Sequence, residues 1–196
     1  WQKLLSAMEW HASCVLNRPS VVMGNFFKPQ QLRLIERFFS VPSTKVLFNE
    51  PIKPELPIIK SISSVRSVVV SHEDLPRSWA YEPVLSQQSV TGYHVRLHVI
   101  GHVFKACRID AALIDYRYCQ DATFSPYDCP RWVRNQAGKM MQALGAIFSG
   151  IDFIVCDHDN WVCLEVNLAP GFPYFDEKLG EAAVLEGLVQ WLEVQY

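Results

Sequence analysis

Two acidic side chains and an amide stand among apolar residues in the stretch IDFIVCDHDNWVCLEVN, which spans residues 151–167. Its alternation of apolar and polar residues predicts two antiparallel strands joined by a short polar turn. If the loop holds an even number of residues centred on His158 and Asp159, Asp152 lies opposite Glu165, and Asn167 points to the same side. Two carboxylates and an amide oxygen, without thiolate or imidazole, suit a hard cation such as Mg²⁺. The alternative is an edge hairpin whose acids face water.

The same even register predicts which side chains of this hairpin are buried. It places Cys156 opposite Trp161, and Ile154 opposite Cys163. The side away from the carboxylates then carries only apolar residues, namely Phe153, Val155, Val162, Leu164 and Val166. Because a strand keeps one set of alternate residues on each face, this side is expected to pack against the core.

Composition and charge narrow the classes of protein to which the chain can belong. It has 196 residues, of which 49% are hydrophobic, and a formal net charge of −2, so charge favours neither a nucleic-acid nor a membrane partner. No apolar run reaches the length of a spanning helix and no signal-peptide pattern opens the chain, so a cytoplasmic location is expected. The six cysteines form no CxxC pair and are expected to be reduced thiols.

The elements that must position these residues follow from hydrophobic periodicity and from turn signals. Strands mixed with helices and antiparallel hairpins predict an α+β fold. The expected elements are a helix over 30–39, strands within 41–51, 55–63, 65–71 and 83–90, a hairpin over 94–110 that turns at Gly101-His102, a helix over 128–150 closed by Gly150, and a C-terminal helix over 180–196.

Several phrases of the sequence together resemble the ATP-grasp ligases, most closely the branch that modifies ribosomal peptides (graspetide synthetases) and the related protein-glutamate ligases. The phrases are NRPSVVMGNFFKPQQL, VPSTKVLFNEP, IKSISSVRSVVV, DYRY, IDFIV and LEVNLAPGFPYF, which cover nearly the whole chain. The resemblance implies two α+β lobes, 21–86 and 87–196, with antiparallel sheets enclosing a nucleotide. It also implies that residues 1–20 are the remnant of an N-terminal domain, and that residues upstream or on a partner complete the acceptor site.

The resemblance also implies the role of each matching residue. Asp152, Glu165 and Asn167 match the positions that hold Mg²⁺, or alternatively Mn²⁺, between the β- and γ-phosphates of ATP. Lys60 and Lys28 match lysines that contact ATP phosphates, although each also fits an ordinary surface lysine.

The hinge and the arginines complete the set of matching residues. The hinge that holds adenine matches Gln87, Gln88, Ser89 and Val90. Three arginines match the positions whose positive charge binds the γ-phosphate and an acyl-phosphate intermediate, namely Arg96 and Arg117 first and Arg108 next. The alternative for each is a surface salt bridge.

Two features depart from the family pattern. The segment SISSVRS contains no glycine where many relatives have a glycine-rich flap, although serines can also donate hydrogen bonds to phosphate. His94 and His102 stand where acids are common in relatives, and both are expected to project from an exposed strand face.

By resemblance, the expected function is that of an ATP-dependent ligase that joins a carboxylate to an amine or a hydroxyl through an acyl phosphate. The expected partners are ATP and a peptide or amino acid that carries the carboxylate; a homo-oligomer is left open. Two alternatives remain, a noncatalytic ATP-binding regulatory module of the same fold and a structural α+β protein without a nucleotide site.

Overall fold

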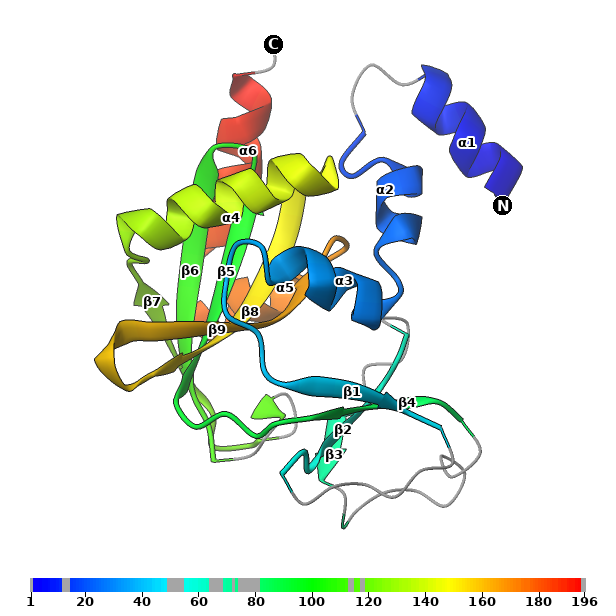
Figure 1. Cartoon of the computed structure of the whole chain (residues 1–196). Coiled ribbons are helices and arrows are strands. Elements are labelled where there is room, and N and C mark those ends of the chain that lie inside the picture. The colour runs from blue at the N-terminus through cyan, green and yellow to red at the C-terminus, as the bar shows by residue number, and fades with distance from the viewer. Residues whose placement is uncertain are drawn as a thin grey trace.

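The computed structural model describes residues 2–11, 15–48, 55–63, 69–71, 73, 82–112, 115–116 and 119–194. Two antiparallel sheets, one of five strands and one of four, are arranged with helices around them (Figure 1). The predicted α+β class is therefore confirmed. Within these ranges, no helix combines the length and the apolar character needed to cross a membrane.

The larger sheet has the strand order β7-β6-β5-β8-β9. Its strands are β5 (Tyr93–Ile100), β6 (Val103–Asp110), β7 (Thr123–Tyr127), β8 (Phe148–Cys156) and β9 (Asn160–Asn167). The hairpin of β5 and β6 turns at Gly101 and His102 as predicted, and Gly101 has the positive φ of 58° that such a tight turn favours. Strand β9 is one edge of this sheet.

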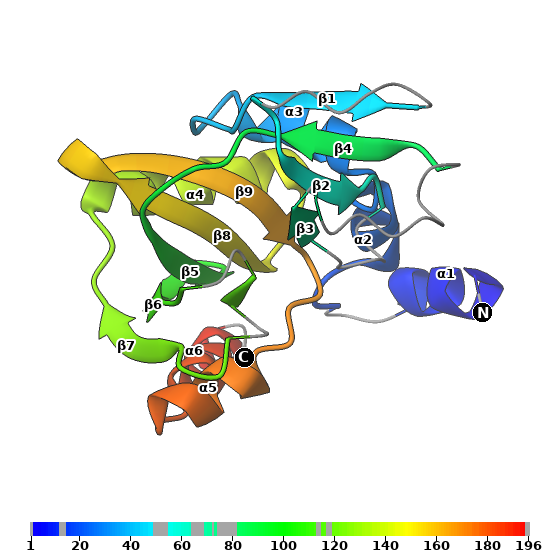
Figure 2. The same cartoon turned by 90° about the horizontal axis from the view of Figure 1, so that it is seen from below.

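Helices cover both faces of the five-stranded sheet. Helix α4 (Arg131–Leu144) lies on one face, and α5 (Pro173–Leu179) and α6 (Ala183–Glu193) lie on the other (Figures 1 and 2). The main core lies on the α4 face and includes Val95, Leu97 and Val99 of β5, Ile151, Phe153 and Val155 of β8, and Val133, Ala137 and Met140 of α4. This burial of apolar side chains is what holds the sheet and the helix together.

The smaller sheet has the order β1-β4-β2-β3 and lies below the larger one in Figure 1. Its strands are β1 (Thr44–Leu47), β2 (Ile58–Ser61), β3 (Val69–Ser71) and β4 (Val84–Gln87). A small core of Leu47, Ile59 and Val84 packs on it. The segment 88–92 connects this sheet to β5 of the larger one.

The remaining helices precede the first strand. They are α1 (Gln2–His11), α2 (Pro19–Gly24) and α3 (Lys28–Ile35), and α3 contacts β9. The buried side chain of Asn17 joins this part of the chain to the larger sheet, because its Oδ1 accepts from the backbone N–H groups of Ile147 and Phe148 at 2.7 and 2.9 Å. Its Nδ2 donates to the carbonyl of Leu168 at 2.7 Å.

The bounds of all three predicted helices differ from the prediction. The C-terminal helix, predicted over 180–196, spans Ala183–Glu193 as α6. The helix predicted over 128–150 ends at Leu144, because Gly145 adopts the left-handed conformation with φ 66° and stops the helix. Gly150 lies inside β8 instead of closing the helix. The helix predicted over 30–39 spans Lys28–Ile35, with Pro29 in its first turn, where a missing N–H costs nothing.

The tip of the β8–β9 hairpin also differs from the prediction. The loop has an odd number of residues, Asp157–Asp159, with positive φ at His158 and Asp159, so Cys156 pairs with Asn160 and not with Trp161. The even-loop prediction was therefore wrong. Consequently Ile154 pairs with Val162, where Cys163 had been expected.

A β-bulge restores the expected pairing farther down the hairpin. Phe153 pairs with Cys163 whereas Asp152 pairs with Glu165, so Leu164 is the extra residue on β9. The predicted opposition of Asp152 and Glu165 is confirmed, although for a different reason. The buried apolar side of β9 consists of Trp161, Cys163 and Val166, so the predicted placement of Val162 and Leu164 on that side was wrong.

Candidate active site

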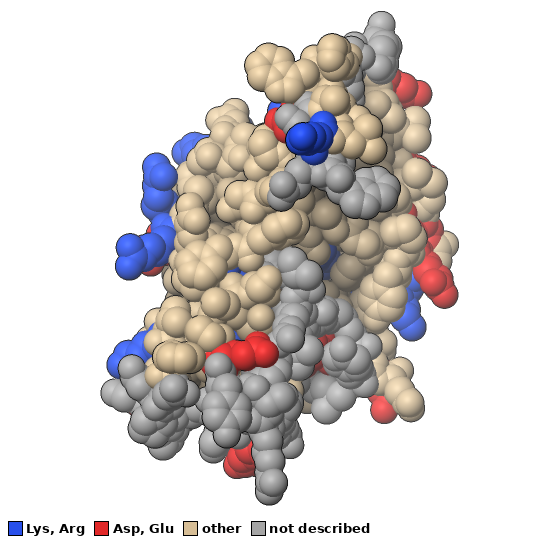
Figure 3. All heavy atoms as spheres, turned by 90° about the vertical axis from the view of Figure 1, so that its right-hand side faces the viewer, with Lys and Arg blue, Asp and Glu red and all other residues tan. Residues whose placement is uncertain are grey.

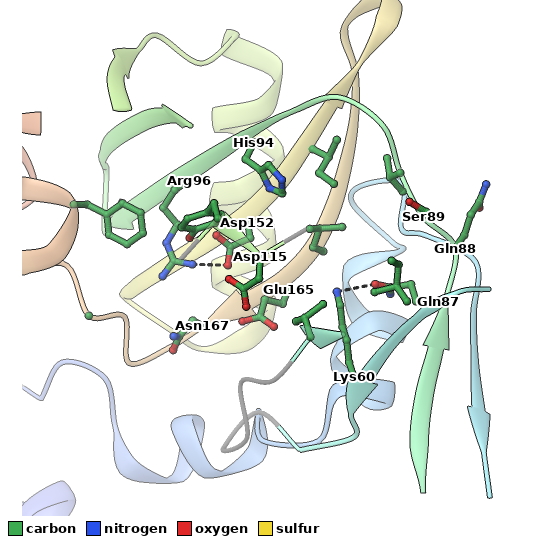
Figure 4. Close-up of a pocket in the computed structure, with 18 of the residues that line it drawn as sticks. Lys60, Gln87, Gln88, Ser89, His94, Arg96, Asp115, Asp152, Glu165 and Asn167 are labelled. Carbon is green, nitrogen blue, oxygen red and sulfur yellow. Dashed lines mark hydrogen bonds and ion pairs between the residues drawn. The ribbon is translucent and has the colours of Figure 1, made fainter. Parts of the chain in front are cut away.

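A cavity of about 330 Å³ lies between the two sheets (Figure 4). Its wall comes from β2, β4, β5, β8, β9, the hinge after β4 and the start of α5. The predicted site residues that line it are Lys60, Gln87, Gln88, Ser89, Val90, Arg96, Asp152, Glu165 and Asn167. Segments far apart in the sequence thus converge on one cavity.

The three predicted metal ligands lie together on the cavity side of the β8–β9 hairpin. Asp152 is opposite Glu165, and Asn167 follows two residues later on the same strand (Figure 4). The Oδ1 of Asn167 accepts a hydrogen bond from the backbone N–H of Ala169 at 2.9 Å, which orients the amide. Two carboxylates and an amide oxygen fit Mg²⁺, which takes few protein ligands and completes its shell with water and phosphate oxygens. Among the described residues, no three His, Cys, Asp or Glu side chains form a metal site by themselves.

Arg96 is buried beside these ligands and is paired with one of them. Its Nη1 donates to Oδ2 of Asp152 at 2.6 Å, and its guanidinium lies 5.2 Å from the ring centroid of Phe175. Burial, the largest single effect, lowers the pKa of Arg96, but the charge and hydrogen bond of Asp152 together with the charges of Tyr116 and Glu165 outweigh it, so the pKa is raised. Burial, the largest effect, and the charge of Glu165 raise the pKa of Asp152 although Arg96 acts in the opposite direction. The pair therefore carries an electrostatic cost that a bound cation at Asp152 would relieve.

Gly150 makes room for the guanidinium of Arg96. A Cβ atom at this position would overlap Nη2 and Cζ of Arg96. Gly150 pairs with Asn167 of β9. Because Gly150 has no side chain, the guanidinium of Arg96 can lie over it, next to the predicted metal ligands. The sequence prediction treated Gly150 as a helix end and missed this role.

Lys60 points into the cavity from β2 and is held by a chain of polar side chains. Its Nζ donates to Oε1 of Gln87 at 2.7 Å, and Nε2 of Gln87 donates to the hydroxyl of Thr44 at 2.8 Å. Burial lowers the pKa of Lys60, and the carboxylate of Glu165 opposes that effect. Because the amide of Gln87 is neutral, it orients the ammonium group without cancelling its charge. The sequence prediction had assigned Gln87 a role through its backbone and missed this side-chain contact.

Lys28 is also buried, which contradicts the alternative of a surface lysine. Its side chain is about 6% exposed, and its Nζ lies 3.7 Å from Oε2 of Glu165. Lys28 therefore lies next to a predicted metal ligand. Lys60 is buried as well, so the surface alternative is wrong for both lysines.

The hinge residues Gln88, Ser89 and Val90 line the opposite end of the cavity. Gln88 and Ser89 are exposed, and the backbone N–H of Gln88 donates to the carbonyl of Ser43. The nearby apolar lining comes from Ile58, Val69, Ile154 and Leu164. This end of the cavity thus combines exposed hinge residues with apolar side chains.

The other two predicted arginines are not part of the described cavity lining. Arg108 pairs in register with Val95, whose side chain is in the α4-side core, so Arg108 is on the opposite face from the cavity. Its guanidinium donates to Asp110 at 2.9 and 2.7 Å and lies 4.0 Å from the ring centroid of Tyr93. Arg117 lies outside the described residues, as does part of the segment SISSVRS.

Sequence reasoning missed several residues of the cavity. His94 is half-buried and lines it, so the expectation of an exposed strand face was wrong. His102 is exposed, but it lies at the hairpin turn and not on a strand face. Burial lowers the pKa of His94. The two-residue period that places Arg96 in the cavity also places His94 there, so this signal was available. The other missed residues are Asp115, Tyr116, Gly171, Tyr174 and Phe175.

On one face of the molecule, charge is less concentrated than in the cavity. On the face shown in Figure 3, the described surface is mostly uncharged, and acidic and basic side chains lie mainly at its margins. The described part of that face therefore presents no broad basic surface of the kind that binds nucleic-acid backbones.

Comparison of the fold with solved structures identifies similar proteins. No protein-family model and no curated protein matches the sequence. The ATP-grasp ligase PsnB, solved with a phosphomimetic variant of its minimal precursor, Mg and ADP, matches with a TM-score of 0.74 and 22% identity over 96% of this chain. The macrocyclase MdnC of Microcystis aeruginosa MRC, solved with the precursor peptide MdnA, matches with a TM-score of 0.79 and 18% identity over 100% of this chain.

A third structure shows that the likeness extends beyond peptide-modifying enzymes. The D-alanine–D-alanine ligase of Bacillus anthracis matches with a TM-score of 0.70 and 15% identity over 97% of this chain. The chain spans 65% of the PsnB chain, 70% of the MdnC chain and 72% of the D-alanine–D-alanine ligase chain. These matches cover both sheets and the cavity between them, and the chain therefore has the ATP-grasp fold.

Proposed function

We propose that the chain is the nucleotide-binding part of an ATP-dependent ligase that joins a carboxylate to an amine or a hydroxyl. The observation that carries the proposal is the convergence of Lys60, Arg96, Asp152, Glu165 and Asn167 on one cavity between two sheets. The ATP-grasp fold supports it, because the similar PsnB structure contains Mg and ADP. The two separate sheets support a division into two lobes, and we propose the bounds 21–86 and 87–196 that the resemblance implied.

Each end of the cavity suits a different part of the nucleotide. The hinge 87–90 and its apolar neighbours would hold adenine, and Lys60 and Lys28 would bind phosphate oxygens. Asp152, Glu165 and Asn167 would hold Mg²⁺, which neutralises phosphate charge when it is bound. Arg96 would stabilise negative charge on the transferred phosphoryl group, since a buried guanidinium acts strongly where water is excluded.

The proposed reaction has two steps. In the first, a carboxylate oxygen of the substrate attacks the γ-phosphorus of ATP, the bond to the β-phosphate oxygen breaks, and ADP leaves. In the second, an amine nitrogen or hydroxyl oxygen attacks the acyl carbon, inorganic phosphate leaves, and the nucleophile loses its proton to water or to phosphate. The described residues perform this chemistry by positioning and by charge neutralisation, without a covalent intermediate on the protein.

We propose a peptide as the source of the carboxylate. The similar proteins PsnB and MdnC were solved with a precursor peptide or part of one. The cavity supports this choice because Tyr116, Tyr174 and Phe175 line the end near Arg96, and aromatic side chains offer packing surface for a chain of amino acids.

Binding and turnover together test this proposal. Titration calorimetry with ATP should give binding that Mg²⁺ strengthens, and carboxylate-containing peptides should stimulate ADP formation. Lys60→Met should weaken ATP binding by about 10-fold or more, because it removes a charge-assisted contact of about 1.5–3 kcal/mol. Lys45→Met is the matched control, since Lys45 is an exposed lysine on β1 of the same sheet. Equal affinity of both variants would contradict the assigned cavity.

Nucleotide binding with no ADP formation for any carboxylate peptide would instead favour the noncatalytic regulatory module. Absence of binding at millimolar ATP would overturn both functions and favour a structural protein.

A further inference from the structure

The outer edge of β9 carries an unusual contact beside the predicted metal ligands. None of the described strands pairs with β9 on this side next to Val166, yet the backbone of Val166 is hydrogen-bonded at both polar groups. The side-chain Nε2 of Gln31 donates to the Val166 carbonyl at 2.8 Å, and Oε1 of Gln31 accepts from the Val166 N–H at 3.0 Å. A residue of a neighbouring antiparallel strand makes the same pair of bonds. The buried amide of Gln31 therefore makes the hydrogen bonds that a neighbouring strand would make with Val166.

Further contacts hold the same stretch of β9. Nδ2 of Asn25 also donates to the Val166 carbonyl at 2.9 Å, and the N–H of Cys163 donates to the carbonyl of Ser40 at 2.8 Å. The bulge residue Leu164 and the predicted ligand Glu165 lie between these anchors. A bulge loosens the ladder and increases local twist, so the direction of Glu165 depends on what fixes the strand on either side.

Val166 stands between two of the predicted metal ligands. Its side chain is in the α4-side core, whereas Glu165 and Asn167 line the cavity. The N–H of Val166 belongs to the peptide group that joins it to Glu165, and its carbonyl belongs to the peptide group that joins it to Asn167. Fixing both groups therefore fixes the direction of both neighbours, which point to the face opposite Val166. A rotation of either peptide plane would move the side chain of the adjoining ligand.

Helix α3 also connects this strand to the lysine side of the cavity. Lys28 lies one turn before Gln31 and places its ammonium 3.7 Å from Glu165. The backbone N–H of Lys28 donates to the carbonyl of Ile62 at 2.9 Å, two residues after Lys60. In Figure 1, α3 lies above the smaller sheet and beside the β8–β9 edge. One short helix thus touches both the strand of the metal ligands and the segment that follows Lys60.

We propose that Gln31 is a positioning residue, which holds the two peptide groups that flank Val166 so that Glu165 and Asn167 point at one cation. The inference rests on the proposed function, since it assigns Gln31 to the same metal position. Gln31 contacts neither nucleotide nor substrate in this assignment. Its effect should therefore appear in the affinity for Mg²⁺ and not in the affinity for the nucleotide without metal.

Calorimetric binding of ADP, with and without Mg²⁺, separates these effects without relying on turnover. Gln31→Met keeps the length of the side chain and removes both hydrogen bonds. It should weaken the apparent Mg²⁺ affinity in the presence of ADP by about 10-fold or more, the usual loss when an outer support of a metal ligand is removed. Binding of ADP without Mg²⁺ should change less than about twofold, because Gln31 does not contact the nucleotide. Gln30→Met is the matched control, because Gln30 is less buried on the same helix, and it should leave both constants unchanged.

A second variant keeps the inference testable if Gln31→Met does not fold. Gln31→Glu retains the oxygen that accepts from the Val166 N–H and loses the donor to the Val166 carbonyl. Its Mg²⁺ affinity should therefore lie between those of the original chain and Gln31→Met. Where Gln31→Met is unfolded, the Mg²⁺ affinity of Gln31→Glu should lie below that of the original chain. Unchanged Mg²⁺ affinity in a folded Gln31 variant would overturn the positioning role, and so would equal losses with and without Mg²⁺. If the unaltered chain itself binds no nucleotide, the proposed function fails, which is a different result.

Discussion

On the α4 face of the five-stranded sheet, β5 and β8 contribute Val95, Leu97, Ile151 and Phe153, which are all buried among apolar neighbours. On the other face, the same two strands contribute Arg96, His98 and Asp152, which are buried as well or nearly so. The apolar face is stable by burial alone. The polar face depends on specific partners, because an unpaired buried charge costs several kcal/mol.

The polar face is not fully satisfied in the described residues. Within that part of the chain, Nε of Arg96 and Nε2 of His98 are buried without a hydrogen-bond partner. Burial, together with the charge of Arg96, holds the pKa of His98 well below its ordinary value, so the imidazole is neutral. The α4 face therefore contributes mainly to stability, whereas Arg96 and Asp152 on the other face are positioned to bind charged groups. Four substitutions and one labelling measurement test this separation.

Phe153→Ala should have the largest effect and should act on stability. Phe153 is fully buried on the α4 face, and its ring lies 4.9 Å from that of Phe39 and 5.2 Å from that of Trp161. Removing it leaves a cavity and should lower the free energy of unfolding by about 3–5 kcal/mol, measured by urea denaturation. The folded fraction should still bind MgATP. A loss of nucleotide affinity without a loss of stability would contradict the division between faces.

Glu165→Gln should give the opposite pattern. It removes the charge of a predicted metal ligand and should reduce Mg²⁺-dependent turnover by at least about 100-fold. The free energy of unfolding should change by less than about 1 kcal/mol, because the side chain is partly exposed. Steady-state ADP formation and thermal unfolding measure the two effects. Glu193→Gln, an exposed acid at the end of α6, should change neither. Retention of most activity by Glu165→Gln would show that the metal assignment is wrong.

Two glycine substitutions compare the faces directly. Gly150→Ala places a methyl group where it overlaps the Arg96 guanidinium, so the arginine must move and turnover should fall by about 10-fold or more. At Gly138 of α4 the nearest atom to a new Cβ is Cζ of Phe104 at 3.9 Å, an ordinary contact. Gly138→Ala should therefore stabilise the protein by about 0.5–1 kcal/mol through helix propensity. Kinetics and thermal unfolding of both variants provide the test, and equal activities would contradict the tight approach at Gly150.

Thiol alkylation should show the smallest effect of the tests. It probes whether water and reagent are excluded from both faces of the five-stranded sheet. Burial raises the pKa of Cys107 to about 11 and that of Cys129 to about 12, and it raises the pKa of Cys163 well above its ordinary value. These three thiols stay protonated near pH 8 and should resist alkylation in the native protein, because the thiolate is the reactive form. Cys119 and Cys156 are partly exposed and should be modified first, as mass spectrometry of peptides would show. Rapid labelling of Cys163 without denaturant would indicate an open core. Cys14 lies outside the described residues.

Local patterns in the sequence determined much of the framework. Alternation placed the β5–β6 hairpin and its turn at Gly101. The pairing of Asp152 with Glu165 was predicted correctly, but from a loop length that was wrong. The resemblance of short phrases to the ATP-grasp ligases indicated the fold, and it selected Lys60 and Arg96, which both line the cavity. These features depend on residues that are near in sequence or on motifs with a fixed spacing.

Other features depended on contacts between distant segments, and only the tertiary structure decided them. The bulge at Leu164 compensates for an odd loop, and no local pattern distinguishes this combination from an even loop without a bulge. Gln31 and Val166 are 135 residues apart in the sequence, and the same pattern would also fit a glutamine at the surface. Gly150 could end a helix or admit Arg96, and its neighbours across the sheet decide between these roles. A residue's type limits the bonds it can make, but its partners are chosen by packing of the whole chain.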